Sequence, residues 1–226
     1  MELMGVMSLA FVFGLIHAFD ADHVLAVSGM SMMRRENINQ RYNFCIKWAL
    51  GHGSSVLLIG SMVLLFGMAI PDVMSSMAEQ VVGLMLISIG ILLLIDLVRQ
   101  KNLLMIHHHD QIPLHVHVET SQSINPLHAH RHGTMMIGML HGVAGSATLL
   151  ALLPVGGSSS PVLGMVYLVT FCIGVLVSML FIGGLLGSTL KYVGSFHQNS
   201  VHVLRAVLAC FAITMGLFWM IIASVT

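Results

Sequence analysis

The stretch GLIHAFDADHVLAVSG, residues 14–29, places two histidines and two aspartates inside an apolar run. Ionisable side chains at membrane depth are costly and usually serve a function. At about 100° per residue, His17, Asp20 and His23 share one face of a helix, whereas Asp22 falls on another face. A straight helix therefore does not direct all four side chains to one point. We expect either a kinked or unwound helix near residues 20–22, or one carboxylate that acts through a neighbouring histidine.

The composition of the whole chain is typical of a membrane protein. Of its 226 residues, 57% are hydrophobic and 8% are charged, and the mean hydropathy is +0.93. Soluble domains carry about 25% charged residues. The formal net charge of zero excludes a strongly basic nucleic-acid-binding protein. We predict an all-α integral membrane protein of the bacterial inner membrane, in contact with the lipid bilayer and not with nucleic acid.

Runs of about 20 mostly apolar residues, the length that crosses a bilayer, predict six transmembrane helices. They cover residues 4–30, 43–70, 76–98, 134–153, 162–190 and 200–224. The nine lysines and arginines fall only in or beside the first, third and fifth loops. Because cytoplasmic loops are enriched in Lys and Arg, these three loops should be cytoplasmic and both termini should face outward.

The two halves of the chain share a short pattern. Gly-x-x-His occurs in GLIH, residues 14–17, and again in GMLH, residues 138–141. A second correspondence joins Gly51 with Gly174 and Ser55 with Ser178. A chance match is the alternative. A true repeat would divide the chain into two inverted three-helix units, residues 1–98 and 134–226, joined by a polar cytoplasmic segment, residues 99–133. Inverted repeats are a common transporter architecture, with the substrate site at their interface.

Two further histidines extend the polar cluster. His52 lies in LGHGSSV and His141 in GMLHGVAGSA, where neighbouring glycines let helices approach closely. Imidazole and carboxylate groups form a ligand set suited to divalent metals such as Ni, Co, Zn and Mn. The expected ligands of one intramembrane metal site are His17, Asp20, Asp22, His23, His52 and His141. A helix–helix hydrogen bond is the alternative role for His52 and His141, and Asp20 is either a ligand or a partner that fixes a histidine tautomer.

The segment between the third and fourth predicted spans is rich in histidine. It holds eight of the fourteen histidines, namely His107, His108, His109, His115, His117, His128, His130 and His132. Short His-rich tracts are typical of metal binding. We expect this segment to be an accessory loop that collects metal ions. A pH-sensing loop and a disordered loop with incidental histidines are the alternatives.

The sequence lacks the motifs that a thiol carrier or a typical metalloenzyme would need. Cys45, Cys172 and Cys210 lie far apart in apolar runs, so we interpret them as core residues; a thiol or electron carrier would need paired cysteines. An intramembrane metalloenzyme could use the same His/Asp cluster with a bound water, but the chain has no HExxH motif. A metal sensor would bind ions without moving them. We expect no enzymatic activity and no resident cofactor.

The segment HAFDADH, residues 17–23, fits a His-x4-Asp-His signature and resembles the nickel/cobalt transporter family, as does LGHGSSV with that family's second-span motif. The resemblance implies a secondary permease for Ni²⁺ or Co²⁺, with His17, Asp22, His23 and His52 in the functional positions. It also implies metallochaperones of urease or hydrogenase assembly as cytoplasmic partners. Core members have more spans and later acidic motifs. The sequence HGVAGSATLLAL in the fourth predicted span is more similar to their shorter urease-accessory nickel-permease relatives.

Deletion of residues 107–132 tests whether the histidine-rich segment buffers metal ions rather than conducting them. We expect the shortened chain to transport with a changed apparent affinity, because the intramembrane ligands stay in place. Metal uptake into cells at graded concentrations measures this. Complete loss of transport by a folded, membrane-inserted deletion variant would contradict the buffering role.

Overall fold

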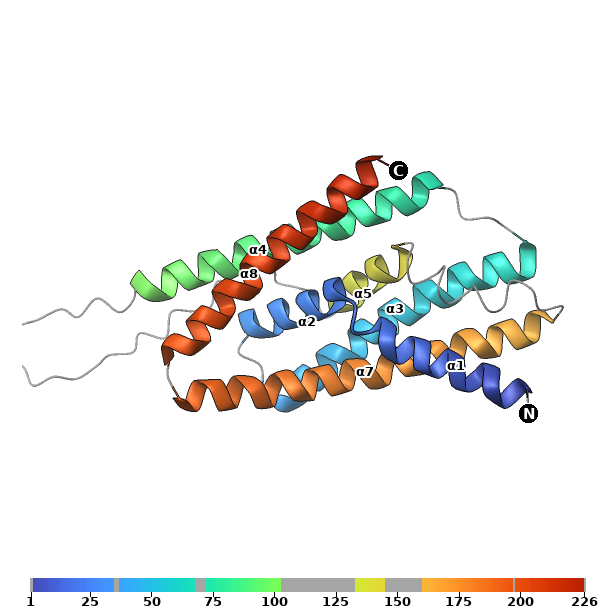
Figure 1. The fold of residues 1–226 in the computed structure, drawn as a ribbon, viewed down its shortest axis with the longest axis horizontal. Coiled ribbons are helices and arrows are strands. Elements are labelled where there is room, and N and C mark those ends of the chain that lie inside the picture. Colours follow the sequence, from blue (N-terminus) through green and yellow to red (C-terminus); the bar gives the residue numbers. More distant parts are fainter. Residues whose placement is uncertain are drawn as a thin grey trace, which may run out of the picture.

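The computed structural model describes residues 2–34, 37–67, 72–102, 133–144, 160–196 and 198–225. The regular structure in these ranges is entirely helical, which confirms the predicted all-α fold. The helices are α1 (Glu2–His17), α2 (Ala21–Arg34), α3 (Ile38–Phe66), α4 (Asp72–Asn102), α5 (Gly133–Val143), α7 (Pro161–Phe196) and α8 (Gln198–Val225) (Figure 1).

Four helices, α3, α4, α7 and α8, are long and apolar enough to cross a membrane. Helices α1 and α2 pass the same test together, as a pair bent by 53°. The described residues thus support four or five candidate spans, against the six that the sequence predicts. The difference lies in the predicted span 134–153, because α5 ends at Val143 and residues 145–153 lie outside the described ranges.

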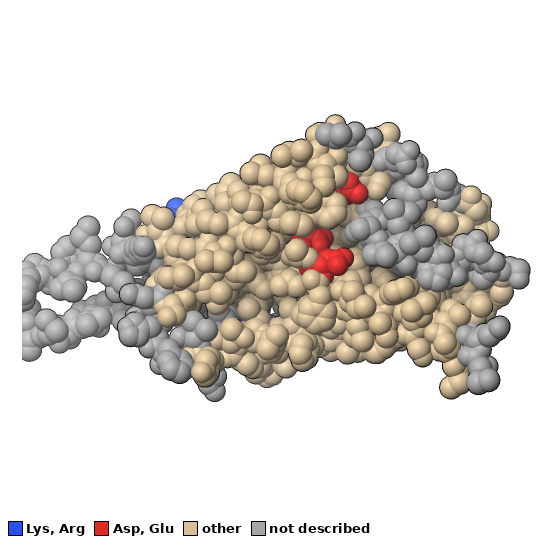
Figure 2. Space-filling view, viewed as in Figure 1, with Lys and Arg blue, Asp and Glu red and all other residues tan. Residues whose placement is uncertain are grey.

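The outer surface of the bundle is apolar. On the face shown in Figure 2, the described surface is almost uncharged, apart from patches of acidic atoms near the middle of the molecule and one small basic patch toward the left end. Large hydrophobic side chains on the long helices are exposed, among them Leu58, Leu65, Val166, Phe181 and Phe218. An apolar surface of this extent is expected for helices that face lipid.

The first predicted span is two helices and not one. Helix α1 ends at His17, and the chain then tightens, with the N–H groups of Phe19 and Asp20 donating to the carbonyls of Ile16 and His17 at 2.9 and 3.0 Å. Helix α2 restarts when the Val24 N–H donates to the Asp20 carbonyl at 3.1 Å. The kink expected near residues 20–22 is therefore present, and it separates the two histidines of the motif onto different helices.

Helix α3 has well-defined ends that correct the predicted boundaries 43–70. Its N-terminus is a capping box: the Asn37 side chain accepts a hydrogen bond from the Gln40 N–H at 2.9 Å, and the Gln40 side chain accepts one from the Asn37 N–H at 3.1 Å. Its C-terminus is Gly67, whose φ of 63° is left-handed and suits glycine. The cap starts the helix earlier than its apolar run does.

Two helix crossings of the same design hold the bundle together. Helix α1 packs against α7 and α3 packs against α5, while α4 lies along α8 (Figure 1). In the first crossing, a Cβ on Gly14 would lie 2.1 Å from the Phe171 carbonyl oxygen. In the second, a Cβ on Gly51 would lie 2.1 Å from the Met135 carbonyl oxygen. Glycine is therefore needed at both crossings so that the backbones can touch.

A serine hydroxyl clamps each crossing. Ser178 on α7 donates to the carbonyl of Leu15 on α1, and Ser55 on α3 donates to the carbonyl of Met139 on α5, each at 2.9 Å. Gly174 and Gly138 complete the two close approaches. These are the residues that the sequence paired between its halves, so the contacts support the predicted inverted repeat, which stays a prediction.

Helix α2 is held inside the bundle, in contact with α4, α7 and α8. Near its C-terminus, Arg205 of α8 donates to the Met32 carbonyl at 3.1 Å and lies 3.2 Å from the Asp96 carboxylate of α4. An arginine at a helix C-terminus complements the helix dipole. The position of α2, and of the motif residues at its other end, is therefore tied to the α4–α8 pair.

Gly51→Ala tests the close approach of α3 and α5. The added methyl group would overlap backbone atoms of α5, so we expect a loss of about 1–3 kcal/mol in stability. Thermal unfolding in detergent measures it. Gly5→Ala is the matched control, because a Cβ at Gly5 would meet nothing within 4 Å. Equal stability of the two variants would contradict the packing described.

Candidate metal centre

Four buried histidines come from four different helices. His17 is the last residue of α1, His23 lies in the first turn of α2, His52 lies midway along α3, and His141 lies near the end of α5. Each is at most 2% exposed. The break after α1 places His17 and His23 next to each other, and the Gly51 crossing brings α5 against α3.

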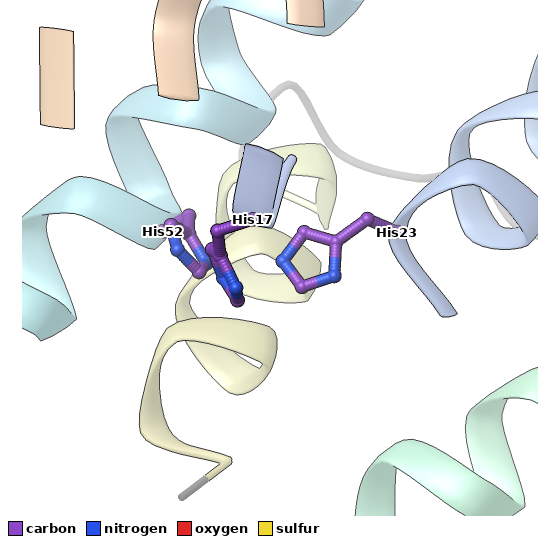
Figure 3. Close-up of side chains that lie close together, drawn as sticks. All are labelled: His17, His23 and His52. Carbon is purple, nitrogen blue, oxygen red and sulfur yellow. The ribbon is translucent and has the colours of Figure 1, made fainter. Parts of the chain in front are cut away.

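Three of these imidazoles form a compact group (Figure 3). The ring centroids of His17 and His23 are 4.6 Å apart, those of His17 and His52 are 5.4 Å apart, and those of His23 and His52 are 5.2 Å apart. One ring nitrogen from each lies within 4.8 Å of the others. A modest adjustment would bring the three nitrogens to the spacing of ligands around one divalent metal ion.

The two aspartates lie beside the same imidazoles. Asp22 Oδ1 is 3.0 Å from His23 Nδ1 and forms a hydrogen bond with it. Asp20 Oδ2 is 2.8 Å from His17 Nδ1, but the direction of this contact is not that of a hydrogen bond. When Nδ1 of His23 carries the hydrogen, Nε2 keeps its lone pair for a metal ion, the common role of a carboxylate behind a ligating histidine.

Several ring nitrogens in this cluster are buried with no hydrogen-bond partner in the described part of the chain: His17 Nδ1, His17 Nε2, His23 Nε2, His52 Nδ1, His52 Nε2 and His141 Nε2. Leaving a buried polar atom unpaired costs about 1–3 kcal/mol. A cluster of such atoms therefore needs an explanation, and a bound cation supplies one. The donor set, imidazole nitrogen with nearby carboxylate, suits a divalent first-row transition metal.

His141 stands slightly apart from the group of three. Its ring centroid is 5.2 Å from that of His23, and its Nδ1 lies 3.1 Å from the carbonyl oxygen of Ile137 in its own helix. With the hydrogen on Nδ1, its Nε2 is free to bind. His141 is thus positioned as an additional ligand and not as a member of the closest trio.

Trp48 forms one wall of the cluster, and the sequence analysis did not identify it. Its ring is fully buried and stacks on His52 with a centroid distance of 5.3 Å and an interplanar angle of 6°. Its ring centroid is also 5.0 Å from that of His23 and 5.3 Å from that of His141. The available signal was its spacing: a residue four positions before His52 shares a helix face with it.

The remaining sequence predictions fall outside this cluster. The eight histidines predicted for the accessory loop, His107 to His132, lie outside the described residues. None of the three cysteines forms a disulfide; Cys45 is buried, Cys172 is partly buried and Cys210 is exposed. Cys172 contacts the Gly53 carbonyl at 3.8 Å.

Fold and site together define a helical multi-pass membrane protein with a buried cluster of imidazoles. The chain belongs to the family described as the cytochrome c biogenesis protein transmembrane region, which matches residues 9–218. It is also similar to the urease accessory protein UreH of Bacillus sp. (strain TB-90), with 27% identity over 190 residues, 82% of this chain and 78% of that protein. No solved structure matches the chain significantly.

These similarities refine the resemblance drawn from the sequence. They place the chain in a transporter-like membrane family and not specifically in the nickel/cobalt transporter family that HAFDADH resembles. They point to a transporter-type protein rather than an enzyme.

Trp48 offers a direct optical test of metal binding. The chain has two tryptophans, so Trp219→Phe leaves Trp48 as the sole indole. We expect Ni²⁺ to quench the fluorescence of this variant strongly, because a paramagnetic ion held by His52 would lie against the stacked Trp48 ring.

The control for this experiment is Trp48→Phe, which keeps Trp219 on α8. Its emission should change little when Ni²⁺ is added. Equal quenching of both variants, or no quenching of Trp48, would count against an ion at the imidazole cluster.

Proposed function

We propose that the protein is a secondary transporter of divalent transition-metal ions, with Ni²⁺ and Co²⁺ as its favoured substrates. One observation carries the proposal. Three buried imidazoles, His17, His23 and His52, meet at the break of a bent apolar helix pair, and each keeps an Nε2 with no hydrogen-bond partner in the described residues. Ligands at a broken helix inside a bundle are typical of transporter substrate sites.

In this proposal the three histidines replace water molecules that the ion loses on entering the membrane. His17, His23 and His52 supply neutral nitrogen ligands, and His141 adds a further one from α5. Asp22 contributes negative charge and fixes the His23 ring through the hydrogen bond at Nδ1. A neutral imidazole competes with protons for the same lone pair, so metal binding is expected to weaken at acidic pH.

The two similar helix crossings, α1–α7 and α3–α5, are where the predicted halves would move to expose the site to each side of the membrane in turn. The α1–α7 and α3–α5 contacts are close glycine crossings with one serine hydrogen bond each, so they resemble each other across the site. Rocking of one predicted half against the other would open the cluster first to one side and then to the other. The site stays in place while access changes.

Two further observations support nickel among the possible metals. The motif at residues 17–23 resembles that of nickel/cobalt transporters, and a distant relative is named a urease accessory protein. Nitrogen ligands bind Cu²⁺ more tightly than Ni²⁺ by the Irving–Williams order. Selection for nickel would therefore depend on the geometry of the site and on metal availability.

The proposed setting is the bacterial inner membrane, with the histidine-rich segment at residues 107–132 on the cytoplasmic side. There it would collect ions and exchange them with metallochaperones of urease or hydrogenase assembly. The family's description mentions cytochrome c biogenesis, but this chain has three cysteines, none of them in a disulfide or in a Cys-x-x-Cys pair. A thiol relay is therefore not favoured.

Flux through liposomes separates transport from the alternatives. We expect the purified chain to admit Ni²⁺ to vesicles holding a fluorescent chelator, with no other substrate present. His52→Ala should lower the initial rate by about tenfold or more, because it removes one ligand of the central group.

His202→Ala is the matched control for this measurement. His202 lies on α8, outside the ligand groups found in the described residues, so its loss should leave the flux near the wild-type rate. Specific metal binding without flux would support a sensor instead. Flux that both variants retain in full would contradict the assigned site.

A further inference from the structure

A second set of ligand atoms adjoins the three imidazoles. Asp20, Asp22 and His23 each offer one atom, and these atoms lie within 4.8 Å of one another. His23 belongs to both groups. The chain therefore holds an oxygen-rich group, Asp20–Asp22–His23, directly beside the nitrogen group His17–His23–His52.

The oxygen-rich group runs from the surface to the interior. The side chain of Asp20 is 41% exposed, that of Asp22 is 10% exposed and that of His23 is 2% exposed. A carboxylate at the middle of an apolar span is costly when it faces lipid. The partial exposure of Asp20 is therefore expected to face water and not lipid.

The two nitrogens of His23 serve the two groups separately. Nδ1 lies 3.0 Å from Asp22, whereas Nε2 has no hydrogen-bond partner in the described residues. Figure 3 shows the ring nitrogen of His23 that is remote from its main chain turned toward His17 and His52. A single side chain thus spans the boundary between the carboxylates and the imidazoles.

A second observation independently points to a ligand at the carboxylates. His17 Nδ1 is buried and lies 2.8 Å from Asp20 Oδ2, yet it makes no hydrogen bond. This nitrogen and this oxygen are close enough to share a partner that lies between them and the other ligands. When Nδ1 of His17 carries no hydrogen, a cation satisfies both atoms, because each then presents a lone pair.

The simpler interpretation is that the aspartates only stabilise the N-terminus of α2. Asp22 does lie in the first turn of that helix, where negative charge is favourable. Asp20 is in the capping position, but in the described part of the chain its carboxylate contacts an imidazole and not a main-chain N–H of α2. Capping therefore does not explain the direction of the Asp20 side chain.

We propose that Asp20, Asp22 and His23 form an outer capture position for a hydrated divalent metal ion, which then passes to His17, His23 and His52. The proposal rests on the transport function proposed above and adds a step to it. Two carboxylates attract and hold a cation that still carries water. The imidazoles then replace the remaining water: the ion leaves the carboxylates on the Nδ1 side of the His23 ring and binds Nε2, which faces His17 and His52.

A capture position has a kinetic signature that a final ligand lacks. If Asp20 acts only on the way in and out, its removal slows arrival at and departure from the inner imidazoles by the same factor. The equilibrium dissociation constant of the inner position then stays the same, because it is the ratio of the two rates. If Asp20 instead binds the ion in its final position, or orients His17 there, its removal weakens the equilibrium constant.

Stopped-flow fluorescence of Trp48 measures all three quantities with Ni²⁺ as the probe. In the Trp219→Phe background, mixing with Ni²⁺ gives the rate of quenching, and mixing the loaded protein with a chelator gives the rate of recovery. We expect Asp20→Asn to slow both by about tenfold, the scale of electrostatic steering, with an unchanged dissociation constant. Glu79→Gln on α4 removes the same charge outside the group and should leave both rates unchanged.

The outcomes separate this inference from the proposed function. Normal quenching with unchanged rates in Asp20→Asn would overturn the capture position and leave the transport proposal intact. A weaker dissociation constant with faster recovery would also overturn it, by placing Asp20 at the inner position. Equal slowing by Glu79→Gln would also overturn the capture position, because the loss of any negative charge would then slow binding and release. Failure of the proposed function itself would be seen without any change at Asp20: the Trp219→Phe protein would show no quenching by Ni²⁺, and the wild-type chain would show no flux.

Discussion

The burial of four imidazoles inside an apolar bundle is the constraint on which the rest of the structure depends. Their ring nitrogens need partners, and the surrounding side chains supply few. The histidines can share a partner only if α1, α2, α3 and α5 come close together. Glycines at the crossings make that approach possible, since a Cβ at Gly51 or Gly138 would lie 2.1 Å from a backbone oxygen of the other helix. The close glycine crossings that pack the helices are therefore also what brings the four imidazoles together.

The break between α1 and α2 determines where the side chains of the motif at residues 17–23 point. An unbroken helix would point Asp22 away from His17, whereas the bend of 53° brings both histidines and both carboxylates of the motif to one place. The same break leaves one carboxylate half-exposed and the other nearly buried. The break between α1 and α2 thus places a partly exposed carboxylate, Asp20, and a nearly buried one, Asp22, next to the buried imidazoles. Arg205 holds the far end of α2 and so fixes where that junction lies.

The family to which the chain belongs and the relative that it resembles carry names that refer to different processes. The family's description refers to cytochrome c biogenesis, and a relative of the chain is named for urease. Here the interior carries histidines, while the cysteines are single and dispersed. Function follows from the side chains placed at the interface between the helices and not from the scaffold alone.

The sequence by itself determined the membrane class, the helical fold and the residues of the cluster, because apolar length and ionisable residues within it are local properties that composition reveals. It located His17, Asp20, Asp22, His23, His52 and His141 but left open how a helix could gather them. Only the tertiary structure decided that the span bends within the bundle, that His17, His23 and His52 meet, and that His141 lies beside His23 and Trp48. Those outcomes depend on contacts between helices far apart in the chain, and no local pattern encodes such contacts.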